Sequence, residues 1–93
     1  EIRRGSKAFL IDRLLIAAIV EYRGNERFNL IAQAASDPNL RSFYESIAES
    51  EARHFELFLK LASSVGGTQA RLDALLEAEA RILNNLPLRA ALH

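Results

Sequence analysis

The chain contains no cysteine among its 93 residues, which excludes disulfides, thiolate metal sites and cysteine nucleophiles. Its 12 basic and 12 acidic residues cancel, so no strong net charge draws it toward nucleic acid or a membrane surface. The longest apolar run, residues 14–20, is too short to cross a bilayer. The polar–apolar alternation of strands is also missing. What remains is one small all-α domain over residues 1–93, expected in the reducing cytoplasm.

Turn-forming residues divide the chain into three predicted helices. Asp37 and Pro38 suit the cap and first position of a helix. Gly66 and Gly67 are typical of a helix end, and Thr68 suits the next cap. With Ser6 as the first cap, the predicted helices cover residues 7–35, 38–64 and 69–84. They form an antiparallel hairpin covered on one side by the third helix.

Ligand-type residues interrupt the apolar faces of the first two helices. Apolar positions recur at alternating spacings of four and three, which predicts one buried face on each helix. Glu21 falls within the first series, and Glu51 and His54 fall within the second. The two series are Leu10, Leu14, Ala17, Glu21, Gly24, Phe28 and Ile31, then Leu40, Tyr44, Ile47, Glu51, His54, Phe58, Leu61 and Val65.

The three residues are also predicted to lie at one height in the hairpin. At about 1.5 Å per residue, Glu21 lies roughly 22 Å before the turn, and Glu51 and His54 lie roughly 20 to 24 Å after it. In Glu51-x-x-His54 both side chains lie on one helix face. Gly24, one turn after Glu21, leaves room beside them.

One carboxylate on one helix and an E-x-x-H on the next make half of a ferritin-like dinuclear metal site. We therefore predict Glu21, Glu51 and His54 as metal ligands, since carboxylate and imidazole suit iron. An E-x-x-H alone is common by chance. The alternative is a non-enzymatic helical interaction module, in which Glu21 and His54 form a buried polar pair that fixes register.

Other charged residues near the motif are assigned weaker roles. Glu26 lies about 140° around the helix from Glu21, so we expect it to pair with a surface arginine and keep it only as a fallback ligand. Arg23, Arg27 and Arg53 either hold the ligand carboxylates or are ordinary surface residues. Glu77 and Glu79 are expected in solvent.

Several strings of this sequence resemble MiaE, a family of tRNA hydroxylases. They are residues 11–23 (IDRLLIAAIVEYR), 26–28 (ERF), 43–44 (FY) and 50–55 (SEARHF). The resemblance implies a ferritin-like fold and a dinuclear non-haem iron site. It also implies O₂-dependent hydroxylation of the isopentenyl group of a methylthio-isopentenyl-adenosine in tRNA. One departure follows Glu21, where the family reads alanine-arginine-serine-cysteine and this chain has tyrosine-arginine-glycine-asparagine.

The resemblance covers only the family's C-terminal half, so one copy of this chain is not expected to build the complete site by itself. A four-helix dinuclear site uses four carboxylates and two histidines, and the second histidine here is the terminal His93. The expected partners are tRNA, an electron donor, and either a missing N-terminal helix pair or a second copy. In the assembled site Glu21 binds one iron, Glu51 bridges or binds terminally, and His54 completes one iron's shell. A ferroxidase or peroxidase is a further alternative.

Overall fold

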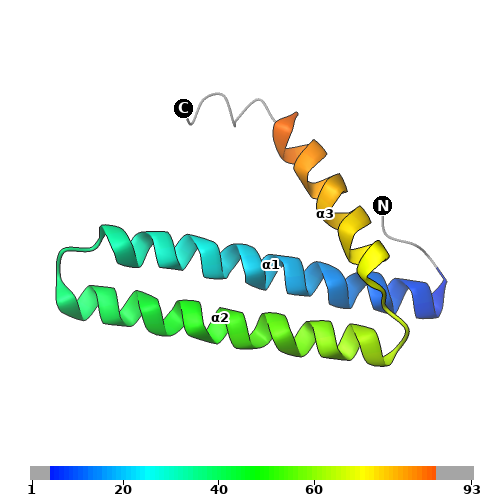
Figure 1. Ribbon diagram of the computed structural model, residues 1–93, viewed down its shortest axis with the longest axis horizontal. Helices are drawn as coiled ribbons and strands as arrows, with labels where there is room; N and C mark the ends of the chain where they lie inside the picture. The colour runs from blue at the N-terminus through cyan, green and yellow to red at the C-terminus, as the bar shows by residue number, and fades with distance from the viewer. Residues whose placement is uncertain (1–4, 86–93) are drawn as a thin grey trace.

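The computed structural model describes residues 5–85 and contains three helices, α1 (Ser6–Ala34), α2 (Pro38–Ser64) and α3 (Gln69–Asn84). Figure 1 shows α1 and α2 side by side as an antiparallel hairpin, with α3 crossing it at an angle. The predicted all-α fold, a hairpin plus a third helix, is confirmed. No helix within residues 5–85 combines the length and the apolar character needed to span a membrane. The tail 86–93, with His93, lies outside the described residues.

The predicted caps of α2 and α3 are confirmed. The Asp37 carboxylate accepts a hydrogen bond of 2.8 Å from the backbone N–H of Asn39, and Pro38 opens the helix. The Thr68 hydroxyl accepts one of 3.1 Å from the N–H of Arg71. The prediction of Ser6 as the first cap is wrong by one residue. Here Gly5 is the cap and has no side-chain oxygen to offer, so Ser6 already belongs to α1.

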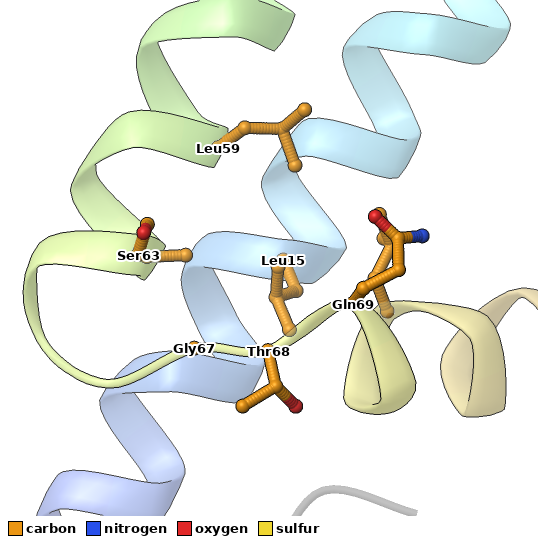
Figure 2. Close-up of a pocket in the computed structure, with 8 residues that line it drawn as sticks. Leu15, Leu59, Ser63, Gly67, Thr68 and Gln69 are labelled. Carbon is orange, nitrogen blue, oxygen red and sulfur yellow. The ribbon is translucent and has the colours of Figure 1, made fainter.

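The turn between α2 and α3 depends on glycine. Gly66 has φ of +104°, a conformation that side chains with a Cβ rarely adopt. The N–H of Gly67 then donates to the carbonyl of Ala62 at 2.7 Å, which closes the end of α2. A cavity of about 190 Å³ lies where this turn faces Leu15 of α1 (Figure 2). The turn directs α3 back across α1.

The core lies between α1 and its two neighbours. Ile11, Leu15 and Ile19 of α1 are buried together with one residue each from α2 and α3. This differs from the predicted core, some of whose members are exposed, as shown by Leu10 at 45% and Leu40 at 50%. The reason is that α3 packs on the other side of α1. The side of the hairpin that carries Glu21 and His54, called the open face below, has no helix over it within residues 5–85.

Two ion pairs fix the position of α3 on α1. Arg71 donates from Nε and Nη2 to the two oxygens of Asp12 at 2.9 and 2.8 Å, and Asp12 is completely buried. Further along, Arg23 donates to both oxygens of Glu79. The acid is on α1 in the first pair and on α3 in the second. If α3 ran in the opposite direction, the two acids would face each other and so would the two arginines, so both pairs form only in the observed direction. Glu79 was expected in solvent, and that prediction is wrong because Arg23 holds it against α1.

Candidate metal centre

Glu21 and His54 meet on the open face. The Oε1 atom of Glu21 lies 2.7 Å from Nδ1 of His54. The carboxylate side chain is 19% exposed and the imidazole is 54% exposed. These residues are 33 positions apart in the chain, and the structure brings them together at the height that helix geometry predicts. The pair lies across the hairpin, with one member on each helix.

Glu51 lies against Gly24 of α1, one helical turn along from Glu21, and does not join the Glu21–His54 contact. Its carboxylate occupies the space where a Cβ on Gly24 would be. Gly24 is buried although it has no side chain, because Glu51 covers it. The expectation that Gly24 leaves room beside the site is therefore confirmed. Any larger residue at this position would move the Glu51 carboxylate.

Asn25 was not singled out from the sequence, yet it joins the two helices at the site. Its side-chain amide donates a 2.7 Å hydrogen bond to the backbone carbonyl of Ala48. Ala48 is almost completely buried, and its small side chain lets the helices approach closely here. The only sequence signal was a polar residue directly after Gly24 in a helix with many apolar positions. Asn25 helps to fix the spacing between the two ligand-bearing helices.

Of the three neighbouring arginines, Arg23 is directed away from the site. Arg23 donates to Glu26 at 2.9 Å, which confirms the expected surface pair for Glu26. The hydrogen bonds from Arg23 to Glu79 and then to Glu26 raise the pKa of this guanidinium, so it stays charged at any ordinary pH. Arg27 and Arg53 are both exposed. Their contribution to the site stays a prediction, as does the fallback role of Glu26.

The donor groups suit iron, but those that meet here are too few to hold it. Carboxylate oxygen and imidazole nitrogen are ligands for Fe(II). The 2.7 Å between Glu21 and His54 is close to the roughly 3 Å that separates adjacent ligands held about 2.1 Å from one ion. Within residues 5–85 no three acidic, histidine or cysteine side chains gather closely enough to hold an ion by themselves. An ion bound to this pair would need further ligands from outside it.

These observations define a class of protein. It is all-helical, and an acid–histidine pair joins the two helices of its hairpin. Within that class the chain belongs to the family described as tRNA-(MS[2]IO[6]A)-hydroxylase (MiaE), whose family model matches residues 1–93.

Two curated relatives carry the name tRNA 2-(methylsulfanyl)-N(6)-isopentenyladenosine(37) hydroxylase. The relative from Salmonella typhimurium is 38% identical over 76 residues, which cover 80% of this chain and 28% of that protein. The relative from Pseudomonas putida is 40% identical over 57 residues, which cover 61% of this chain and 27% of that protein. The chain therefore spans little more than a quarter of the length of these relatives. No solved structure gives a significant match.

Replacing Gly24 by alanine is expected to weaken metal binding without weakening the fold. The new Cβ displaces the Glu51 carboxylate, which is the flexible end of a side chain. Alanine also favours helix over glycine by about 1 kcal/mol. We expect about a tenfold rise in the dissociation constant for iron, measured by titration, with an unchanged or higher melting temperature. Gly5→Ala is the control, because its Cβ would meet nothing within 4 Å. Unchanged iron affinity in Gly24→Ala would show that Glu51 is not a ligand.

Proposed function

We propose that this chain supplies half of the dinuclear iron site of an O₂-dependent tRNA hydroxylase. The substrate is the isopentenyl group of a modified adenosine in tRNA. The contact between Glu21 and His54 across the hairpin carries the proposal, because it joins ligand-type groups of two helices in a chain of the MiaE family. The reaction takes place in the cytoplasm, with tRNA and an external electron donor as partners.

The residues of this chain hold and shield the metal. Glu21 and His54 present an oxygen and a nitrogen to the same space, and Glu51 presents a carboxylate one turn along. Iron, when bound, supplies the oxidation of a C–H bond by O₂. The apolar side chains of the open face keep water from the site once that face is covered, and they match the apolar isopentenyl group. Ala17, Phe28, Ile47 and Phe58 share the sequence spacing of Glu21 and His54 and are therefore expected on this surface.

The remaining ligands come from a second helix pair. A dinuclear site of this type needs four carboxylates and two histidines, and the two relatives are about three and a half times as long as the part they share with this chain. We propose that an N-terminal helix pair of such a longer protein covers the open face. A second copy of this chain is the alternative source of these ligands.

The direct test is oxygen insertion into tRNA. The protein at its full natural length, with Fe(II), O₂ and a reductant, is expected to add one oxygen atom to the isopentenyl side chain. Mass spectrometry of the nucleosides measures the product. Glu51→Ala should abolish the reaction because the carboxylate binds metal. Glu56→Ala, an exposed glutamate of the same helix, should leave it unchanged.

Two outcomes would redirect the proposal. Oxidation of Fe(II) or consumption of peroxide without any modified nucleoside would assign the protein as a ferroxidase or peroxidase. Absence of iron from the purified full-length protein, with the helices intact by circular dichroism, would favour the helical interaction module. Hydroxylation that survives Glu51→Ala would show that the ligand assignment is wrong.

A further inference from the structure

The strongest side-chain link between α1 and α3 at the height of the site is Arg23 with Glu79. Arg23 donates from Nε at 3.2 and 3.0 Å to the two oxygens of Glu79, and from Nη2 at 2.7 Å. Such forked, charge-assisted contacts fix orientation as well as distance. Glu79 is 24% exposed, so the pair is partly shielded from water. The pair lies two residues after Glu21, on α1's opposite side, since two residues turn a helix by roughly 200°.

On the α2 side, the same turn of α1 is held by an aromatic contact. Tyr22 follows Glu21 and packs its ring against Phe55, with the ring centroids 5.3 Å apart. Phe55 in turn follows His54. Consecutive residues of α1 therefore contact α2 through Glu21 and Tyr22, while the third residue contacts α3. The turn of α1 that carries Glu21 therefore has two further attachments, one to α2 through Tyr22 and one to α3 through Arg23.

Apolar packing alone does not hold α3 at this height. A cavity of about 320 Å³ lies between the hairpin and α3, lined by Ile19, Tyr22, Arg23, Phe55, Leu72 and Leu76. Interiors without such space resist movement because their side chains interdigitate. The Arg23–Glu79 pair bridges α1 and α3 beside this space, and so adds to the contacts that set the distance between the two helices.

We propose that Glu79 is a positioning residue for the metal centre. Through Arg23 it sets the place of one turn of α1, and with it the place of Glu21 relative to His54. The inference rests on the proposed function, because it assumes that Glu21 and His54 bind metal. It adds a residue of α3, a helix that carries none of the predicted ligands, to the determinants of metal affinity.

Because Arg23 has a second acidic partner, an effect of Glu79 on the position of the metal ligands can be separated from an effect on the stability of the fold. Arg23 also donates to Glu26 of its own helix at 2.9 Å. When the Glu79 carboxylate is neutralised, Arg23 keeps this second partner and its access to water. No unpaired buried charge is created, so unfolding is expected to change little. The main effect is that Arg23 keeps at most one acceptor oxygen at position 79 in place of the forked, charged contact, so α1 is held less firmly to α3 at this turn.

The test compares Glu79→Gln with Glu77→Gln in the protein at its full natural length. Glu77 lies on the same helix, is 76% exposed, and pairs with Arg81 of that helix. Co(II) serves as the probe, because its visible absorption bands report the number and geometry of ligands. We expect Glu79→Gln to weaken Co(II) binding about tenfold and to alter the bands, while Glu77→Gln matches the unchanged protein. Arg23→Lys, which loses the forked contact, should shift both readouts in the same direction.

A purely structural role predicts a different result. A lower melting temperature in Glu79→Gln, with unchanged Co(II) affinity and bands, would overturn the inference. Equal effects of Glu79→Gln and Glu77→Gln would also overturn it. If the unchanged protein binds no Co(II), the proposed function fails along with this inference. Tight binding that Glu79→Gln leaves intact refutes only the positioning role.

Discussion

Replacing Asp12 by alanine is expected to lower the free energy of unfolding by about 3 kcal/mol. Asp12 is completely buried and accepts two hydrogen bonds from Arg71. Removing one member of a buried ion pair costs roughly 3–5 kcal/mol, because the other charge loses its compensation. The side chain of Arg71 is 24% exposed, so water compensates part of the loss and the lower end of the range applies. Chemical denaturation of the full-length protein measures the change.

Two further variants make this prediction specific. Asp73→Ala removes an exposed aspartate whose contact is with Gln69 on its own helix, and it should cost no more than about 0.5 kcal/mol. Replacing both Asp12 and Arg71 by leucine and methionine should recover most of the lost stability, since an apolar pair leaves no charge unpaired. If Asp12→Ala costs no more than Asp73→Ala, the pair does not anchor α3.

Replacing His54 by alanine is expected to remove iron from the protein. His54 is the one histidine on the open face within the described residues, and its ring lies 2.7 Å from Glu21. Losing a direct ligand should cost more than the 10- to 100-fold typical of groups that only support ligands. We therefore expect iron affinity to fall by more than about 100-fold. Elemental analysis after Fe(II) loading and desalting measures the iron that stays bound.

The neighbouring Glu56 supplies the matched control. It is exposed on α2, two residues after His54, and Glu56→Ala should retain iron while changing the local charge. Circular dichroism should show the same helix content in both variants, because His54 is 54% exposed and alanine favours helix. Equal iron content in His54→Ala and the unchanged protein would remove the metal site from consideration.

The sequence predicted the hairpin and the Glu21–His54 contact because both follow from fixed helix geometry. Each residue adds the same rise and rotation, so a turn with strong signals sets the height of every position on either side of it. Asp37 and Thr68 were recognisable because a cap needs a short side chain with an oxygen. The assignment of Glu21, Glu51 and His54 to a metal stays a prediction.

The side of α1 on which α3 packs could not be predicted in the same way. α1 has apolar residues around most of its circumference, so its pattern does not favour one face for α3 over another. The buried charges were therefore missed. Asp12 interrupts the apolar stretch from Phe9 to Val20, which is a signal of burial with a partner. Glu79 falls on the apolar strip of α3 with Leu72, Leu75 and Leu76, whereas Glu77 does not.

The short connection between α1 and α2 has a consequence for the order of folding events. Two helices joined by three residues, 35–37, can associate from the turn outward, since each new contact closes only a small additional loop. The last turns of α1 and the first turns of α2 meet first, and the Glu21–His54 contact follows as the helices zip together. α3 docks later, because its anchor on Asp12 lies 59 residues away in the chain from Arg71. We expect the acid–histidine pair to form within the part of the chain that folds earliest, ahead of the helix that fixes its geometry.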